Sequence, residues 1–466
     1  MHFIDREREL MYLNEAYQRE GSQFIVIYGK RRVGKTELVR RFFTGIPHIY
    51  FLAEKSSEKD QMVMLSEKTG LAFQDDFLLS RGFGAWREFF RYVRDKGRII
   101  VVVDEYPYLV ESNAAIPSIF QSGWDEELKD SQVFLVLLGS SIGMMETEVL
   151  GYRSPLFGRR TGQILVEPLS FWDAKKFFPS LPFEEFLYIY AILGGVPAYL
   201  MKFDPGTGLW ENIRKNILNP QAYLFAEPEF ILREELREPR HYFSILRALS
   251  LGKRRAGEII NETGLEKNVI GKYLSVLADL RLIRREVPVT EKNPEKSKQG
   301  IHLVNDHFFR FWFDYVFPGR SFILEGEELY LLDRKIRPSM DDFVSPVFEE
   351  ICRSLVRRRG AQELRFHQVG RWWSRRAEID VVALNEDENA ILLGEAKWST
   401  RKVGTDVLAH LKEQAVNVEW GRPRRREYYA LFSRAGFTGE LKERASRERV
   451  LLYDFQEICR EEHAVG

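Results

Sequence analysis

The feature that most constrains the fold is the loop GKRRVGKT at residues 29–36, which matches the pattern G-x-x-x-x-G-K-[ST]. It follows the apolar run 24–27 and precedes a segment, 38–43, with apolar residues at helical spacing. Between a strand and a helix, such a loop cradles phosphates with backbone N–H groups, and a mere glycine turn near lysines would not need those flanks. The predicted nucleotide-binding residues are Gly29, Lys30, Arg31, Arg32, Val33, Gly34, Lys35 and Thr36.

Three more apolar runs follow the loop, at 49–53, 99–103 and 133–138, with helical or polar stretches between them. Strands that alternate with helices are typical of a doubly wound α/β fold with a parallel sheet. The sequence therefore predicts that the first third of the chain is such a domain, with the phosphate-binding loop at its first strand.

Polar residues end two of these runs, where ligands of parallel sheets bind. Asp104 is a candidate Walker B residue that holds Mg²⁺ together with Thr36, and Glu105 is a candidate to polarise an attacking water. Two solvated acids that cap a strand are the simpler alternative. Ser140, after the next run, is a candidate γ-phosphate sensor, although an ordinary Gly-Ser turn explains it almost as well.

Length and composition limit the number of domains, the kinds of partner and the cell compartment that the chain can have. A chain of 466 residues has room for about three domains of typical size. Lys plus Arg (69) equals Asp plus Glu (69), which excludes a purely electrostatic coat for nucleic acid but leaves local basic faces open. Two cysteines favour a reducing compartment, and no run has the length of a membrane span. We expect a cytoplasmic protein without a membrane partner.

Over roughly residues 1–235, several motifs follow one another along the chain in the order that one protein family shows. They are the opening Phe-x-Asp-Arg-Glu, GKRRVGKT, VVVDEYPYL, LLGSS, SPLFGRRTG, EPLSFWDA and LGGVPAYL. Together they resemble the archaeal-type P-loop ATPase family, an AAA+/STAND relative. The resemblance implies ATP as the nucleotide, an ATPase core at 1–180 and a helical lid at 181–238. It also makes Arg159 or Arg160 a candidate arginine finger, in cis or across a homo-oligomer, with a structural salt bridge as the rival role.

The middle of the chain predicts a winged helix-turn-helix at 239–305. Short helical segments broken by Gly264 precede two candidate wing strands, 284–289 and 300–304. The third helix has polar residues such as Lys267 and Lys272 that could meet DNA, yet such domains also serve as plain protein interaction modules. Residues 306–340 form an aromatic connector that we interpret as buried core.

The last third predicts a hairpin with carboxylates on otherwise apolar strands. Asp380 lies on the first strand, and Glu395 and Lys397 share one face of the return strand because side chains alternate. Two carboxylates and a lysine suit metal-dependent phosphodiester hydrolysis. A solvated hairpin with the same residues is the ordinary alternative.

The order Asp, hairpin, Glu-x-Lys resembles the PD-(D/E)XK nuclease superfamily, whose fold is the α/β restriction-endonuclease-like one. The resemblance implies such a domain at 341–466, with Glu349 as a further acidic metal ligand on the first helix and Gln414 as the superfamily's common glutamine. Mg²⁺ is the expected metal, and Mn²⁺ is an alternative at this site.

The leading hypothesis is an ATP-hydrolysing protein that acts on DNA through a nuclease-like site that the ATPase controls. In the alternative, the protein is an ATP-dependent regulatory switch whose winged helix and catalytically silent C-terminal domain bind DNA or protein. A purely structural ATPase module is a third, weaker hypothesis.

Overall fold

The computed structural model of the chain describes residues 3–236, 238–360 and 364–460 and divides into two compact units. The first comprises residues 1–174, 195–201 and 279–281, and the second comprises the remainder. Each unit is described by itself below. The five domains drawn from the sequence remain predictions.

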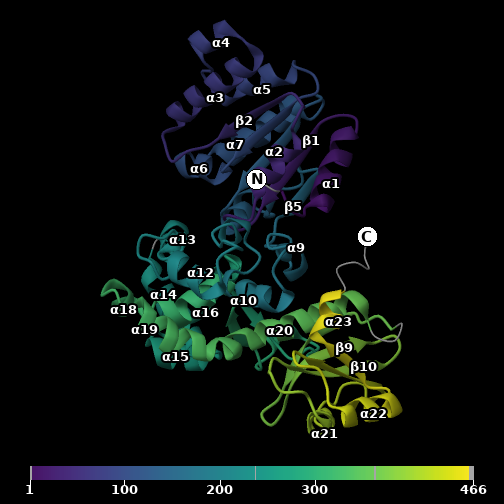
Figure 1. The fold of residues 1–466 in the computed structure, drawn as a ribbon. Coiled ribbons are helices and arrows are strands. Elements are labelled where there is room, and N and C mark those ends of the chain that lie inside the picture. Colours follow the sequence, from purple (N-terminus) through teal and green to yellow (C-terminus); the bar gives the residue numbers. More distant parts are fainter. Residues whose placement is uncertain (1–2, 237, 361–363, 461–466) are drawn as a thin grey trace. The chain divides into compact units, whose positions relative to one another are not determined.

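The first unit is built on a five-stranded, wholly parallel sheet with strand order β2-β3-β4-β1-β5 (Figure 1). The strands are β1 (Gln23–Tyr28), β2 (His48–Leu52), β3 (Ile100–Asp104), β4 (Phe134–Gly139) and β5 (Gly162–Leu165). The four apolar runs are thus confirmed as neighbouring strands of one parallel sheet. The short strand β5, which carries a glycine and a glutamine, had no such signal in the sequence.

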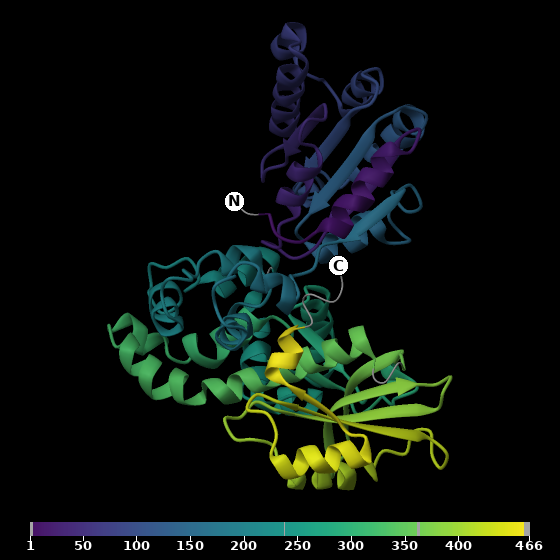
Figure 2. The ribbon, with the colours of Figure 1, turned by 45° about the vertical axis from the view of Figure 1, so that its right-hand side comes forward.

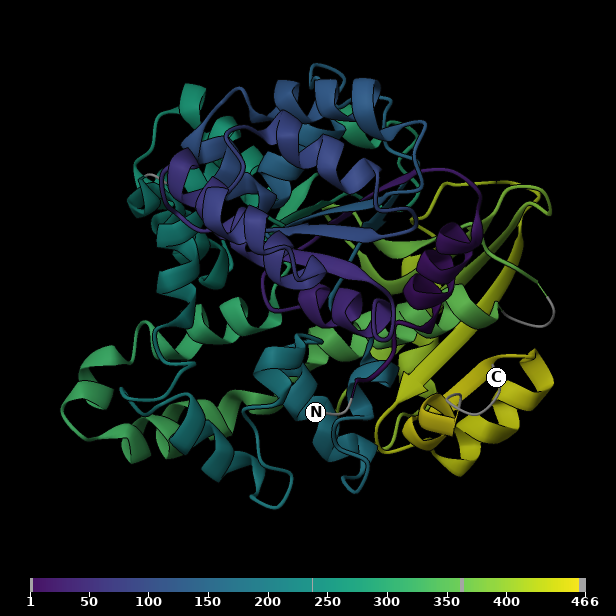
Figure 3. The ribbon, with the colours of Figure 1, turned by 90° about the horizontal axis from the view of Figure 1, so that it is seen from above.

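Helices cover both faces of this sheet, as Figure 3 shows. The helices are α1 (Glu7–Gln18), α2 (Lys35–Phe42), α3 (Glu58–Phe73), α4 (Asp76–Arg81), α5 (Trp86–Arg94), α6 (Tyr106–Ser112), α7 (Ile116–Gly123), α8 (Ile142–Met144) and α11 (Pro197–Leu200), with π-helical turns η1 (Trp124–Leu128) and η2 (Met145–Leu150). Apolar residues of α1 and α2 pack with alternate residues of the central strands, and those of α3, α5, α6 and α7 pack on the opposite face.

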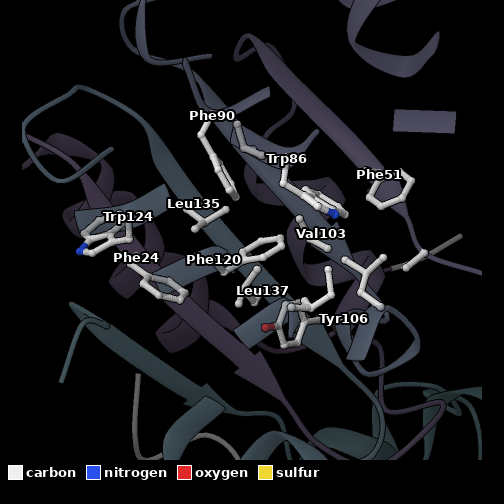
Figure 4. Packing of buried hydrophobic residues seen from close by; sticks show 14 of the residues in the cluster. Phe24, Phe51, Trp86, Phe90, Val103, Tyr106, Phe120, Trp124, Leu135 and Leu137 are labelled. Atoms are coloured by element: carbon white, nitrogen blue, oxygen red, sulfur yellow. The ribbon is translucent and has the colours of Figure 1, made fainter. Parts of the chain in front are cut away.

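The larger of the two cores is rich in aromatic rings (Figure 4). The ring of Phe120 lies 5.1 Å from that of Trp86, 5.2 Å from Phe90 and 5.3 Å from Tyr106. A Cβ at Gly123 would lie 2.3 Å from the Phe90 ring, so this position on α7 accepts only glycine without a shift. This packing fixes β3 and β4, whose ends carry Asp104 and Ser140.

The second unit begins with a helical region that includes a three-helix group and a two-stranded sheet. Its elements are α10 (Phe183–Leu193), α12 (Leu209–Asn216), α13 (Glu227–Glu235), α14 (Pro239–Ser250), α15 (Ala256–Thr263), α16 (Lys267–Asp279), β6 (Ile283–Glu286), η3 (Pro294–Lys296) and β7 (Ile301–Val304). The strands β6 and β7 pair antiparallel, and the His302 N–H donates to the Arg254 carbonyl at 2.8 Å. The expected helices and strands are therefore present.

The aromatic stretch that follows is buried, as expected. It forms α17 (His307–Phe311) and the π-helical turn η4 (Trp312–Val316), and Phe308, Phe311 and Trp312 are at most 1% exposed. The connection continues through α18 (Arg320–Leu324), α19 (Glu328–Leu331) and η5 (Leu332–Ile336) into the long helix α20 (Arg337–Arg359). Among the described residues, no helix combines the length and apolar character needed to cross a membrane.

The C-terminal part contains a mixed five-stranded sheet with order β12-β11-β10-β9-β8. Its elements are β8 (Gln368–Trp373), β9 (Glu378–Asn385), β10 (Ala390–Lys397), α21 (Thr405–Ala415), β11 (Arg426–Ser433), α22 (Gly439–Glu448), β12 (Leu451–Asp454) and α23 (Phe455–Arg460). Strands β8, β9 and β10 are antiparallel neighbours, whereas β10, β11 and β12 are parallel. In Figure 2, α20 lies on one face of the sheet, and α21 and α22 lie on the other.

The predicted hairpin is confirmed as β9 and β10. Trp372 and Trp373, which precede the hairpin, belong to strand β8 and are 7% and 8% exposed. Both rings therefore pack against protein and are not available to stack on bases.

Candidate functional site

The phosphate-binding loop connects β1 to α2 and has the backbone that its glycines allow. Gly29 has φ 151° and Gly34 has φ 94°, both in the region that favours glycine. A Cβ at Gly29 would lie 2.3 Å from the Val166 carbonyl oxygen, so a side chain there would displace the loop. Gly34 caps α2, whose first N–H groups and positive dipole end favour a phosphate.

Lys35 is 5% exposed and its Nζ donates to the carbonyl oxygens of Gly29 (2.9 Å) and Lys30 (3.0 Å). The ammonium is thus held over the loop that it is expected to serve. Burial, together with the nearby Arg32 charge, lowers the pKa of Lys30 to about 7. A buried cation that is costly to keep charged is stabilised by an anion, as a phosphate would be.

Thr36 and Asp104, the two residues predicted to hold Mg²⁺ at this site, contact each other. The Thr36 hydroxyl donates to Asp104 Oδ2 at 2.9 Å, and the Tyr50 hydroxyl donates to the same oxygen at 2.5 Å. Burial and this carboxylate raise the pKa of Tyr50. A hydroxyl and a carboxylate are the hard oxygen donors that Mg²⁺ takes, so these residues fit that ion. Tyr50 is a site residue that sequence reasoning missed, because only pairing of β2 with β3 brings it to Asp104.

Glu105 and Ser140 are joined across the ends of β3 and β4. Ser140 Oγ donates to Glu105 Oε1 at 2.5 Å, and the Ser140 N–H donates to Oε2 at 3.3 Å. Glu105 has φ 53°, a left-handed conformation that is unusual for this residue type and concentrated at functional sites. The candidate base and the candidate sensor therefore act as one hydrogen-bonded pair.

The two candidate arginine fingers differ in their surroundings. Arg159 forms an ion pair with Asp125 of η1, with Nη2 at 2.8 Å from Oδ2, and Nη1 donates to the Pro155 carbonyl at 2.8 Å. Within the described residues, the Arg160 side chain, which is partly exposed, has no hydrogen bond or ion pair. Arg159 therefore forms the structural salt bridge that was the rival role for these two arginines.

Arg6 is a second residue that sequence reasoning missed. It belongs to the opening motif, is 6% exposed, and donates through Nη2 to the Val33 carbonyl of the loop at 3.3 Å and to the Glu167 carbonyl. The side chain ties the phosphate-binding loop to the segment after β5. The motif position was visible in the sequence, but its partners were not.

The second candidate site lies on the C-terminal sheet. Lys397 Nζ donates to Glu395 Oε1 at 2.5 Å, and the Ala396 N–H between them donates to Asp380 Oδ2 at 3.1 Å. The register of β9 and β10 thus brings Asp380, Glu395 and Lys397 together, as the alternation of side chains predicted. Burial raises the pKa of Asp380 and, with the Asp380 charge as the second cause, that of Glu395.

Glu349 of α20 has arginine neighbours. Arg353 Nη1 lies 3.5 Å and Arg371 Nε 3.8 Å from Glu349 Oε2, while Arg353 also donates to the Asp380 carbonyl at 2.8 Å. Burial and the Asp380 charge nevertheless raise the pKa of Glu349 to about 7.

The described part of the chain contains no group of three or more His, Cys, Asp or Glu arranged to hold a metal. Asp380 and Glu395 are therefore a two-carboxylate pair, which fits Mg²⁺ because that ion keeps several waters. Gln414 of α21 lies with its Nε2 3.3 Å from His410 Nε2, and its Oε1 is buried without a hydrogen-bond partner.

Comparison with known proteins supports an ATPase site at the phosphate-binding loop. Residues 3–203 match the ATPase domain described as predominantly from Archaea, and residues 312–410 match a domain of archaeal and bacterial proteins of unknown function. The uncharacterized protein MJECL04 of Methanocaldococcus jannaschii is 35% identical over 404 residues, which cover 86% of this chain and 88% of that protein. The uncharacterized ATP-binding protein MJ0423 of the same organism is 40% identical over 40 residues, 9% of this chain and 68% of that protein.

Among solved structures, the Walker-type ATPase PABY2304 of Pyrococcus abyssi covers 67% of this chain and 96% of its own, with a TM-score of 0.50 and 24% identity. This likeness concerns the fold. The extended similarity to MJECL04, the matched ATPase domain and the geometry of the phosphate-binding loop agree with one another. The chain belongs to the family of P-loop ATPases whose ATPase domain is found predominantly in Archaea.

Proposed function

We propose that this ATPase acts on DNA and controls a metal-dependent nuclease-like site formed by Asp380, Glu395 and Lys397. The observation that supports the proposal is the arrangement of these three side chains, linked by the hydrogen bonds at Glu395 and Ala396. The two carboxylates lie on strands whose other residues are mostly buried and apolar. Burial of a charged group costs free energy of folding, so acids at such positions are often part of a binding or catalytic site.

Each residue has a role in this proposal. Asp380 and Glu395 would hold Mg²⁺ or Mn²⁺, which polarises a phosphoryl oxygen and lowers the pKa of bound water when present. Lys397 is 43% exposed at its side chain, so its ammonium can approach a phosphodiester while it orients Glu395. The opposing Glu395 interaction overcomes the effect of burial and raises the pKa of Lys397, which therefore remains a cation at neutral pH.

The DNA-contacting part of the proposal rests on α16. Lys267, Asn268 and Lys272 are exposed on this helix, while Ile270, Leu274 and Leu277 are buried. The exposed face can offer cations and an amide to phosphates and base edges. We propose that α14, α15, α16, β6 and β7 form the winged helix that engages DNA.

A cleavage assay tests the nuclease. Purified protein would be incubated with single-stranded, duplex and branched DNA, with Mg²⁺ or Mn²⁺, and with or without ATP. We expect cleavage that Asp380→Asn and Glu395→Gln reduce at least 10²-fold, and that Glu386→Gln, an exposed acid on the same hairpin, leaves unchanged. Cleavage that survives Asp380→Asn would exclude the site.

The ATPase arm of the assay uses Lys35→Ala. This change should abolish ATP hydrolysis, since it removes the cation over the loop, whereas Lys68→Ala on the exposed side of α3 should not. If ATP controls the nuclease, Lys35→Ala should also remove the effect of ATP on cleavage while leaving Asp380 and Glu395 intact.

The alternative is a regulatory switch with a catalytically silent C-terminal domain that binds DNA or protein. It is favoured by the arginines around Glu349, which occupy the acid expected to be a third ligand, and by the lack of a three-ligand group among the described residues. ATP-dependent DNA binding without cleavage of any substrate would favour this function.

A further inference from the structure

A cavity of about 330 Å³ lies within the second unit, and Asp380, Glu395 and Lys397 are not among its lining residues. It is lined by the end of α14 and the loop after it, by β6 and β7, by α17 with η4, by α20 and by β8. The volume is at the lower end of the range for pockets that hold small molecules.

The lining is unusually rich in guanidinium groups. Five arginines and three carboxylates line the cavity, and three of the arginines also pair with Glu286, Glu349 and Glu378 outside the lining. The arginines are Arg254, Arg284, Arg310, Arg353 and Arg371, and the acids are Asp314, Asp342 and Glu350. A guanidinium group in a hollow of low dielectric attracts an anion more strongly than the same group on an open surface.

Part of this charge is already used inside the protein. Arg284 pairs with Glu286 at 2.7 Å and with Glu350, Arg371 pairs with Glu378, and Arg353 donates to the Asp380 carbonyl. These bonds fix three guanidinium groups in place. Preorganised donors cost little to align with a ligand.

Two other arginines of the lining have guanidinium groups that are less engaged with protein acids and can bind an anion. The Arg254 side chain is exposed and, among the described residues, makes no hydrogen bond or ion pair. Arg310 donates to the Phe343 carbonyl and stacks 3.9 Å from the Phe343 ring centre, and burial lowers its pKa. Asp314 and Glu350 act in the opposite direction and raise this pKa, and a bound phosphate would further offset the cost of keeping the buried guanidinium charged.

Two buried polar atoms at the cavity also lack a hydrogen bond within the described structure, Asp314 Oδ1 and Arg371 Nε. Buried groups of this kind are costly when unsatisfied. Burial raises the pKa of Asp314 to about 7, so near neutral pH part of the population has a protonated carboxyl that can donate to an anionic oxygen.

We propose that this cavity binds a phosphate group, either as free phosphate or on a ligand no larger than a mononucleotide. Forked guanidinium donors match the geometry of phosphate oxygens, which can accept from several arginines at once. The cavity shares no lining residue with the phosphate-binding loop, and the proposal does not depend on nuclease activity.

The test is calorimetric titration of the full chain carrying Lys35→Ala, which disables the first phosphate site. Inorganic phosphate and adenosine 5′-monophosphate are the two ligands. Binding of either supports the proposal, and the tighter of the two identifies the source of the phosphate group. Lack of binding by both overturns it.

Matched variants in the same background locate the binding. Arg254→Ala should weaken it about tenfold, which equals about 1.4 kcal/mol, whereas Lys253→Ala, exposed and outside the lining, should change it less than twofold. Asp342→Asn removes a negative charge from the lining and should tighten binding about threefold. Equal losses in Arg254→Ala and Lys253→Ala, or weaker binding in Asp342→Asn, would overturn the assignment.

Discussion

Thr36 Oγ1 donates a hydrogen bond of 2.9 Å to Asp104 Oδ2 and so joins the phosphate-binding loop to the end of β3. The two residues are distant in sequence, yet each is one of the oxygen donors expected for Mg²⁺. The contact holds the two predicted Mg²⁺ donors next to each other.

We expect Asp104→Asn to raise the Mg²⁺ concentration for half-maximal ATP hydrolysis at least tenfold, because it removes the anionic donor. Tyr50→Phe removes only the hydroxyl that donates to the same oxygen, so its effect should be threefold or less. Mg²⁺ titrations of ATPase rate measure both. Equal effects of the two variants would contradict the assignment of Asp104 as a ligand.

If Glu105 is the general base, Glu105→Gln should reduce kcat for ATP hydrolysis about 10²–10⁴-fold while nucleotide binding is retained, because the amide cannot accept the proton. Ser140→Ala should have a smaller effect of about tenfold, since Ser140 holds the Glu105 carboxylate. Single-turnover rates and nucleotide affinity separate chemistry from binding. Full activity in Glu105→Gln would exclude it as the base.

The ion pair of Arg159 with Asp125 predicts different outcomes for two neighbouring arginines. Arg160→Ala should lower kcat about 10²-fold if Arg160 meets the developing charge of the γ-phosphate. Arg159→Ala should mainly lower the melting temperature, and Asp125→Asn should do the same. A kcat loss confined to Arg159→Ala would reverse the assignment.

Asp314 predicts a pH-dependent stability. Burial raises its folded-state pKa from 3.8 to about 7 against the attraction of Arg310, so folding favours the protonated carboxyl. The contribution of Asp314 to the free energy of unfolding is favourable at low pH and is lost as the pH rises from about 4 through about 7. We therefore compare the melting temperature of Asp314→Asn with that of the unchanged protein at each pH. This difference should be about 2–4 °C more favourable to the variant at pH 8 than at pH 5. Exposed Glu325→Gln serves as the control, and a pH-independent difference would contradict the prediction.

The aromatic core of the first unit should be sensitive to truncation. Phe120 is 1% exposed and touches three other rings, so Phe120→Ala should cost about 3–5 kcal/mol of unfolding free energy. Phe77→Ala removes a ring that is 69% exposed and should cost less than about 1 kcal/mol. Denaturant unfolding measures both, and similar costs would contradict the packing in Figure 4.

The sequence by itself determined the phosphate-binding loop, the four apolar strands of the first unit and the hairpin with Asp380, Glu395 and Lys397. Each depends on local rules: glycine conformations at fixed spacing, apolar runs, and alternation of side chains along a strand. These rules need no knowledge of what a segment packs against.

Only the tertiary structure decided which partners these residues meet. Tyr50 reaches Asp104 through strand pairing, Arg159 is taken up by Asp125, Arg353 and Arg371 approach Glu349, and Trp372 and Trp373 are buried. The arginines of the cavity likewise come from segments between residues 254 and 371. Ion pairs, burial and shared cavities depend on contacts between distant segments, and local sequence patterns do not encode those contacts.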